Sequence, residues 1–248
     1  MCDRCDHRLS LAFVPSRRGL LLGASAMLMS GLARAKEDRK ENRKEKTPPK
    51  PQNAISPEAA LERLKQGNER YVEGVARRHD FRHERKALAL GQNPYAAILG
   101  CADSRIAPEY AFDSGRGDLF VCRVAGNFAN PESVASLEYA VSVLATPAIL
   151  VLGHDACGAV DATIKSLKDN TTLPGHLPSL VEGLAPAVNA VSGQAGDVLA
   201  NAIKQNVIDT VARLKSATPI LSAAVDQGKL KVAGGIYRLG SGKVDMVA

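Results

Sequence analysis

Short apolar runs alternate with longer amphipathic stretches through most of the chain. The apolar runs fall at residues 95–100, 119–122 and 148–152, and each contains almost no polar residue. Such continuous runs are typical of strands that are buried on both faces, as in a parallel sheet. We therefore predict an α/β fold with a mostly parallel central β-sheet and helices on both faces.

Amphipathic segments with recognisable helix boundaries separate these runs. A long N-terminal helix is predicted to begin at Ser56, which can cap it, with Pro57 at its first position, and to end near Gly74. The other predicted helices end at Gly91, cover 131–145, begin at Cys157, and cover 180–191, 198–215 and 218–227. Residues 230–239 and 244–247 flank a glycine-rich turn, which predicts an antiparallel edge strand at the C-terminal end of the sheet.

The first 54 residues have a composition unlike that of the rest. Arg17 and Arg18 precede a weakly apolar stretch that ends in Ala33-Arg34-Ala35, a pattern typical of a cleavable twin-arginine export signal over residues 1–35. A charged, proline-containing stretch at 36–54 predicts a disordered linker. We therefore expect residues 55–248 to form one folded domain of an exported, periplasmic bacterial protein with no stable membrane span in its mature form. An uncleaved N-terminal anchor is the alternative.

The charge of the chain argues against a nucleic-acid partner. The formal net charge is +6, but residues 1–35 hold five arginines and two acidic residues, and 36–50 hold seven basic and four acidic residues. These two segments account for the whole excess, so the predicted domain is close to neutral. It also lacks tryptophan, and aromatic residues make up only 4% of the chain. Neither a basic surface nor a set of stacking side chains for nucleic acid is indicated.

Three side chains that bind soft metal ions follow two of the predicted strands. Cys101 comes directly after the run at 95–100, His154 follows the run at 148–152, and Cys157 begins the next helix. Binding sites of open parallel sheets form at the carboxyl ends of strands, so we expect the three residues to converge there. Two thiolates and one imidazole suit Zn²⁺, and three protein ligands leave a fourth coordination position open for chemistry.

Asp103 and Arg105 follow Cys101 closely and form a candidate catalytic pair. The guanidinium of Arg105 can hold the carboxylate of Asp103 through two parallel hydrogen bonds. A carboxylate held in this way can accept a hydrogen bond from a zinc-activated hydroxide and so orient its lone pair toward a substrate carbon. The alternative is that the two residues form only a structural ion pair.

The motifs Cys101-Ala102-Asp103-Ser104-Arg105 and His154-Asp155-Ala156-Cys157-Gly158 together resemble those of the β-class carbonic anhydrases. The resemblance covers roughly residues 55–247 and includes the stretches 123–127, 136–141 and 235–238. It implies that residues 55–248 form a β-carbonic-anhydrase-like catalytic domain that binds Zn²⁺ and reversibly hydrates CO₂ to bicarbonate and a proton. It further implies a homodimer or homotetramer, and a closed state in which Asp103 binds zinc as a fourth ligand.

Other interpretations of these residues stay open. The same zinc site can serve an enzyme that acts on carbonyl sulfide or carbon disulfide, or a non-catalytic zinc-binding protein. Cys101 and Cys157 can also be inert core residues, or form a disulfide in an oxidising compartment. Cys122 lies inside an apolar run and is more typical of a buried structural thiol. His176 is predicted to be a loop residue, with a proton shuttle as the alternative role.

Overall fold

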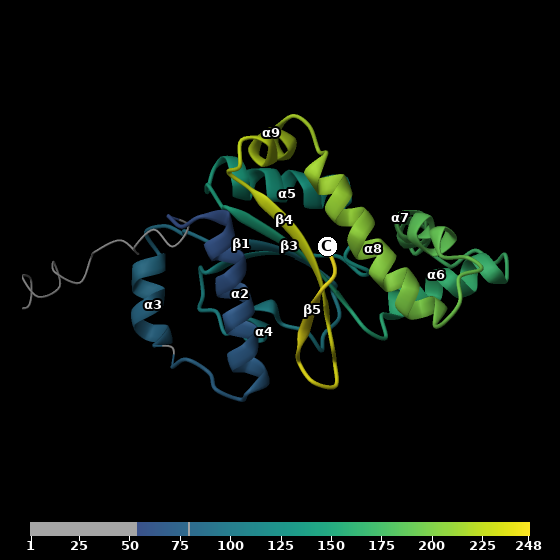
Figure 1. Ribbon diagram of the computed structural model, residues 1–248, viewed down its shortest axis with the longest axis horizontal. Helices are drawn as coiled ribbons and strands as arrows, with labels where there is room; N and C mark the ends of the chain where they lie inside the picture. The colour runs from purple at the N-terminus through teal and green to yellow at the C-terminus, as the bar shows by residue number, and fades with distance from the viewer. Residues whose placement is uncertain (1–53, 79) are drawn as a thin grey trace, which may run out of the picture. The chain divides into compact units, whose positions relative to one another are not determined.

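The computed structural model describes residues 54–78 and 80–248 of the chain (Figure 1). The predicted export signal at 1–35 and the linker prediction up to residue 53 lie outside the described residues. The rest contains five strands: β1 (Ala96–Gly100), β2 (Leu119–Arg123), β3 (Ala148–His154), β4 (Lys231–Tyr237) and β5 (Val244–Met246). They form one sheet in the order β2-β1-β3-β4-β5, in which only the β4–β5 pair is antiparallel. The predicted α/β class and the antiparallel C-terminal edge strand are both confirmed.

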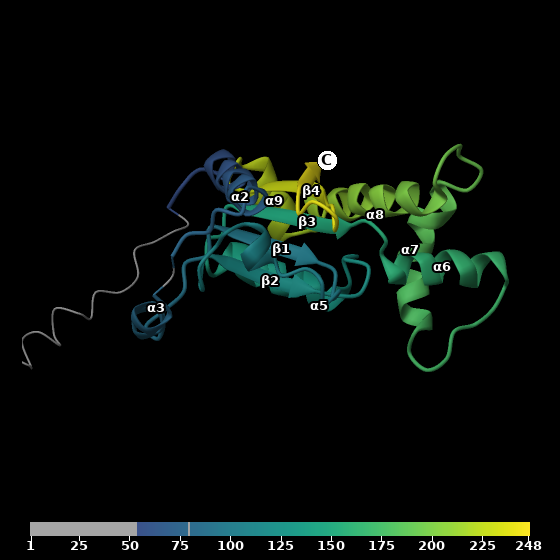
Figure 2. The same cartoon turned by 90° about the horizontal axis from the view of Figure 1, so that it is seen from below.

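Helices cover both faces of this sheet. The described helices are α2 (Pro57–Val72), α3 (Phe81–Leu88), α4 (Pro108–Ala111), α5 (Pro131–Ser142), α6 (Gly158–Lys168), α7 (Pro178–Ala190), α8 (Val198–Lys215) and α9 (Ile220–Asp226). The views in Figures 1 and 2 place α3 at one end of this part and the α6–α7 pair at the other. Among the described helices, none has the length and apolar character needed to cross a membrane.

The strand side chains alternate between two apolar cores. Leu99 and Val151 point to one face, where they pack with buried residues of α5, α7, α8 and α9. Ile98 and Leu150 point to the other face, where they pack with α2 and the region of α4. Both faces of the sheet are apolar because the strands contain almost no polar residue, as the sequence predicted.

Several elements differ from the predicted ones, mostly by one to three residues at a boundary. Helix α5 ends at Ser142 rather than at residue 145, because Ala145 adopts a left-handed backbone (φ 53°) that leaves the helix. The four-residue helix α4 was not predicted, since one turn carries too little periodicity. Strand β3 extends to His154, whereas the apolar run suggested an end at residue 152. His154 is therefore held inside the sheet rather than in the loop after it.

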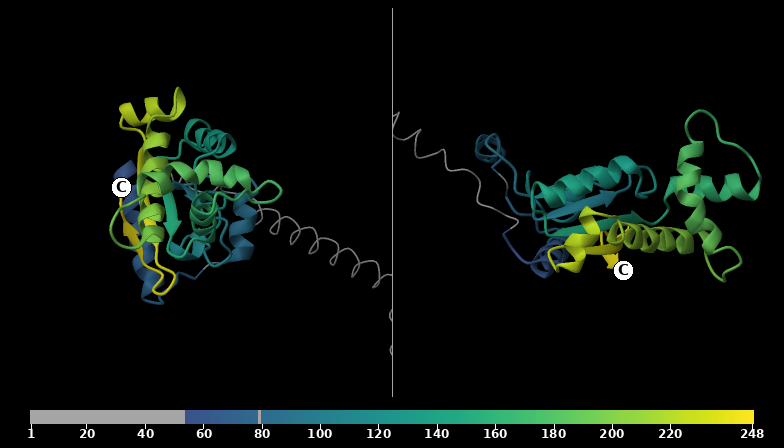
Figure 3. Two further views of the ribbon diagram at one scale, coloured as in Figure 1. Left: turned by 90° about the vertical axis from the view of Figure 1, so that its right-hand side faces the viewer. Right: turned by 90° about the horizontal axis from the view of Figure 1, so that it is seen from above.

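Strand direction determines where the functional residues meet. Strands β1 and β3 are parallel neighbours, with Gly100 in register with Leu152, so their carboxyl ends emerge side by side. Figure 3 shows helices α6 and α7 beyond these strand ends. The segment that follows β1 and the loop between β3 and α6 consequently lie next to each other.

Candidate metal centre

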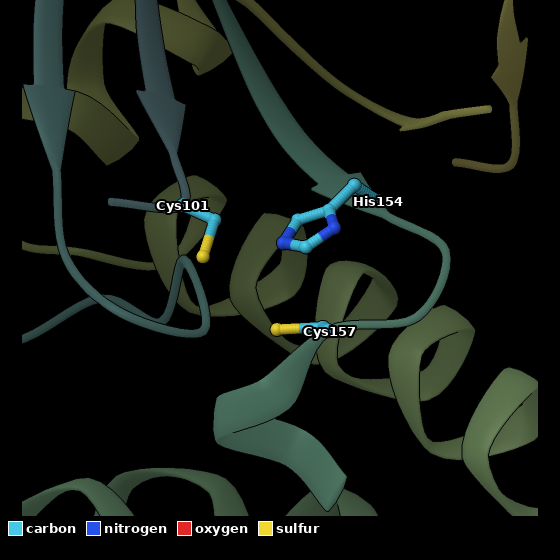
Figure 4. Close-up of side chains that lie close together, drawn as sticks. All are labelled: Cys101, His154 and Cys157. Atoms are coloured by element: carbon cyan, nitrogen blue, oxygen red, sulfur yellow. The ribbon is translucent and has the colours of Figure 1, made fainter. Parts of the chain in front are cut away.

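Cys101, His154 and Cys157 converge at the carboxyl ends of β1 and β3. Cys101 is the first residue after β1, His154 is the last residue of β3, and Cys157 directly precedes the first residue of α6. All three are buried, and their ligand atoms lie within 4.8 Å of one another. Figure 4 shows the two sulfur atoms and the imidazole ring directed toward a common point. Ligand atoms that share one zinc ion at about 2.0–2.3 Å lie at most about 4.6 Å apart, so the group is close to the size that one ion can bridge.

The hydrogen bonding of His154 leaves one ring nitrogen for a metal. Nδ1 lies 2.8 Å from the carbonyl oxygen of Asp155, which can only accept, so Nδ1 carries the proton. The other nitrogen, Nε2, is buried and has no hydrogen-bond partner among the described residues. A buried acceptor without a partner is unfavourable, and coordination to a cation would satisfy it. The arrangement is typical of a metal-binding histidine.

Only one of the two cysteine thiols ionises readily in the absence of a cation. The pKa of Cys101 is lowered to about 4, chiefly by a hydrogen bond from the Cys157 thiol, and the N–H of Gly126 also donates to its sulfur at 3.3 Å. The pKa of Cys157 is raised, because its thiol donates a hydrogen bond to Cys101 and because burial and the charge on Cys101 also oppose a second ionisation. Two thiolates therefore need a cation between them, which is the role that a divalent metal fills.

Asp103 is held by Arg105 at the edge of this group. The side chain of Arg105 donates from Nε to Oδ1 at 2.9 Å and from Nη2 to Oδ2 at 2.7 Å, and its backbone N–H donates to Oδ1 at 2.9 Å. These bonds hold the pKa of Asp103 well below its usual range, so the carboxylate is ionised. Its Oδ2 lies 3.8 Å from Nε2 of His154. Asp103 thus faces the metal-binding group while its carboxylate is bound to Arg105.

Arg123, at the end of β2, contributes a second clamp that sequence reasoning did not find. Its guanidinium donates to the carbonyl oxygens of Cys101 at 2.9 Å, Asp103 at 2.6 Å and Ile106 at 2.9 Å. The segment that carries Cys101 and Asp103 is therefore fixed through its backbone as well as through its side chains. The available signal was a cation at the end of the apolar run 119–122, which does not indicate which groups the cation binds.

The loop between His154 and Cys157 is equally constrained. Ala156 has a left-handed backbone (φ 51°), which is unfavourable for a residue with a Cβ. Asp155 fixes this loop on the C-terminal hairpin, because its N–H donates to the carbonyl oxygen of Tyr237 at 3.2 Å and its Oδ1 accepts from the N–H of Leu239 at 2.9 Å. Arg105 also reaches the carbonyl oxygen of Ala156 at 3.4 Å. This bond joins the segment after β1 directly to the loop between β3 and α6.

The remaining candidates are not part of the group of three. Cys122 is a half-buried free thiol in β2, and burial raises its pKa, as expected for a structural cysteine. His176 is exposed in the turn before α7, in agreement with its prediction as a loop residue. Cys101 and Cys157 are both free thiols, so the disulfide alternative is not what the structure contains.

Comparison with known proteins supports an assignment to a family. The family model described as carbonic anhydrase matches residues 96–244. Carbonic anhydrase 2 of Mycobacterium tuberculosis is 40% identical over 189 residues, covering 76% of this chain and 91% of the relative. The carbonic anhydrase of Mycolicibacterium smegmatis is 38% identical over 193 residues, covering 77% of this chain and 93% of that protein.

The chain belongs to the β-carbonic anhydrase family. Solved β-carbonic anhydrases share its fold. The structure of the β-carbonic anhydrase CcaA matches with a TM-score of 0.59 at 29% identity, covering 76% of this chain and 98% of that one. The Coccomyxa β-carbonic anhydrase matches with a TM-score of 0.56 at 26% identity, covering 75% and 81%. The predicted resemblance is confirmed at the level of family and fold, and the chain is an enzyme of the carbonic anhydrase family.

Proposed function

We propose that this β-carbonic anhydrase reversibly hydrates CO₂ to bicarbonate and a proton, with Zn²⁺ held by Cys101, His154 and Cys157. The observation that carries the proposal is the buried, unpartnered Nε2 of His154, which lies within 4.8 Å of the ligand atoms of the two cysteines. Membership of a family whose relatives are named carbonic anhydrases supports the same reaction. A soft set of two sulfurs and one nitrogen fits zinc better than it fits a hard cation such as magnesium.

Three protein ligands leave one coordination position for the chemistry. When bound, zinc would acidify a coordinated water and so supply a nucleophilic hydroxide near neutral pH. The two cysteine thiolates carry the charge that balances the metal, and the Asp155 carbonyl holds the His154 ring with Nε2 facing the metal position. CO₂ itself is uncharged, so its binding requires no charged group from the protein.

Asp103 would orient the attacking hydroxyl group. Its carboxylate is ionised and its Oδ2 faces the metal position, so it can accept a hydrogen bond but cannot donate one. A hydroxyl that donates to Asp103 presents its lone pair to the carbon of CO₂. Arg105 holds Asp103 in this orientation through both side-chain bonds. The pair supports an open site, because Asp103 would have to leave Arg105 to become a fourth zinc ligand.

Assembly and location are part of the same proposal. We propose a homodimer or homotetramer, as the resemblance implied, and a solved relative in the same fold is described as a tetrameric β-carbonic anhydrase. We also propose export to the periplasm, which depends only on the sequence pattern of residues 16–35. Mass spectrometry of the mature N-terminus tests export, because a chain that keeps Met1 in the membrane fraction would contradict cleavage of the signal.

Stopped-flow measurement of CO₂ hydration at pH 8 and above, together with metal analysis, tests the reaction. We expect about one zinc per chain and a hydration rate that zinc removal abolishes. Full zinc occupancy without hydration would overturn the proposal. Turnover of carbonyl sulfide or carbon disulfide by that same sample would indicate the other enzyme activity, and its absence a non-catalytic zinc protein.

A further inference from the structure

One amide side chain from α8 reaches the turn that contacts the sulfur of Cys101. Asn206 is buried in the middle of α8 and its Nδ2 donates to the carbonyl oxygen of Gly126 at 2.7 Å. The N–H of the same glycine donates to Sγ of Cys101 at 3.3 Å. Although Asn206 and Cys101 are 105 positions apart in the sequence, these two hydrogen bonds connect them through Gly126 alone.

The turn around Gly126 is held on its other sides by backbone contacts and packing. The N–H of Asn127 donates to the carbonyl oxygen of Val124 at 2.9 Å, and Gly126 has the left-handed backbone (φ 83°) that favours glycine. A Cβ on Gly126 would lie 2.7 Å from a methyl group of Leu184 in α7, so the helix packs directly on the turn. The carbonyl group of Gly126 is oriented by Asn206.

Resting on the proposed zinc chemistry, we propose that Asn206 is a positioning residue for the metal centre. It fixes Gly126 so that the glycine N–H stays directed at the Cys101 sulfur. A hydrogen bond to a thiolate withdraws electron density from the sulfur and also fixes the direction of its lone pairs. Asn206 therefore controls how strongly, and from which direction, Cys101 binds the metal.

The test replaces Asn206 by Leu, which has nearly the same shape but cannot donate a hydrogen bond. Thr210→Val is the matched control, because Thr210 is also buried and lies one turn further along α8. Full-length protein is loaded with Co²⁺ in place of zinc, and three properties are measured: the sulfur-to-cobalt charge-transfer band, the dissociation constant for the metal, and kcat and KM separately.

For Asn206→Leu we expect a charge-transfer band at longer wavelength, since a thiolate that loses a hydrogen bond is a better electron donor. Metal affinity should fall about 10-fold, the lower end of the range for residues that support metal ligands. We expect kcat to fall with KM unchanged, because CO₂ does not contact Asn206. Thr210→Val should leave all three properties as in the wild type.

An unchanged band in Asn206→Leu would overturn the inference, even with weaker metal binding, since that result would mean only looser packing. Where Asn206→Leu does not fold, Asn206→Asp replaces it, because a carboxylate of the same size cannot donate to the carbonyl of Gly126. If neither variant folds, Asn206 is required for the fold and the positioning role is rejected. Failure of the proposed function is distinct: the wild-type protein itself would then lack a thiolate band or CO₂ hydration.

Discussion

Asp103→Asn is the sharpest perturbation of the proposed mechanism because it changes the polarity of one position with little change in shape. In the wild type, both carboxylate oxygens accept hydrogen bonds from Arg105, and Oδ2 also faces His154. An asparagine has only one acceptor oxygen. In the wild type, the backbone N–H and Nε of Arg105 both donate to Oδ1 of Asp103. Because Arg105 has only donors there, the oxygen of the asparagine should occupy the position of Oδ1. The NH₂ group then takes the place of Oδ2.

The expected loss follows from this exchange. At the position that faces the metal, a charged acceptor becomes a neutral donor, which can no longer receive a hydrogen bond from the attacking hydroxyl group. Positioned side chains that handle a proton in this way contribute about 10²–10⁴-fold to a rate. We expect kcat for CO₂ hydration to fall by about 10²-fold or more. Zinc content should not change, because Asp103 is not among the three residues of the metal-binding group.

The assay combines stopped-flow CO₂ hydration at pH 8 and above with zinc analysis of the same samples. Asp118→Asn is a matched control, because the Asp118 carboxylate is as little exposed as that of Asp103, at 12% against 16%. It also pairs with an arginine and accepts a backbone N–H bond, from Arg63 at 3.2 Å and from Gly115 at 2.9 Å. The control should hydrate CO₂ at the wild-type rate.

Two outcomes would refute this reasoning. Wild-type kcat in Asp103→Asn would mean that the carboxylate serves only as a structural partner of Arg105. A loss of zinc in proportion to the loss of activity would mean that Asp103 is a metal ligand, and that the open arrangement proposed for the site is wrong.

Three further predictions concern other parts of the structure. Cys101→Ser should remove most bound zinc and all hydration activity, as metal analysis and the hydration assay would show, whereas a wild-type zinc content would exclude Cys101 as a ligand. Gly126→Ala should lower the free energy of unfolding by about 2–3 kcal/mol in urea denaturation, through backbone strain and overpacking against Leu184; Gly158→Ala, where nothing lies within 4 Å, should have little effect. Asp113→Asn should cost about 1–3 kcal/mol at pH 7, since Arg70 at 2.6 Å holds the pKa of Asp113 below its usual value. Because the folded-state pKa is depressed, that contribution is present above pH 4 and is lost as the pH falls further, so the difference in urea denaturation should shrink by pH 3.

The sequence determined the fold class through a simple physical signal. Runs such as 148–152 contain almost no polar side chain, and only a strand covered on both faces can tolerate that pattern. The order of the strands could not be predicted in this way, because strands of this kind are buried on both faces whichever neighbour they pair with. The end of α5 was missed because the chain leaves the helix through a left-handed Ala145, a conformation that is rare for alanine and that its residue type does not signal.

The convergence of the three candidate metal ligands could be predicted because a parallel sheet brings the ends of its strands together. Residues directly after β1 and at the end of β3 must be neighbours once those strands pair, whatever the loops do. Arg123 and Asn206 were different, since both act through backbone carbonyl groups. A carbonyl is present at every position of the chain, so no sequence pattern marks which one a distant side chain will bind. Contacts of this kind become visible only in the folded structure.

A divalent cation would account together for three features of the site that neither a disulfide nor a protonated histidine explains. A disulfide between Cys101 and Cys157 would remove the competition between the two thiols for negative charge, but it would leave Nε2 of His154 buried without a partner. A proton on Nε2 would make the ring positive and give it a partner in Asp103, but Cys157 would stay a neutral thiol. With a divalent metal bound, Nε2 of His154 would have a partner, Cys157 could lose its proton, and a positive charge would lie beside Asp103. Arg105, which binds both oxygens of the ionised Asp103, would then keep that carboxylate from becoming a metal ligand.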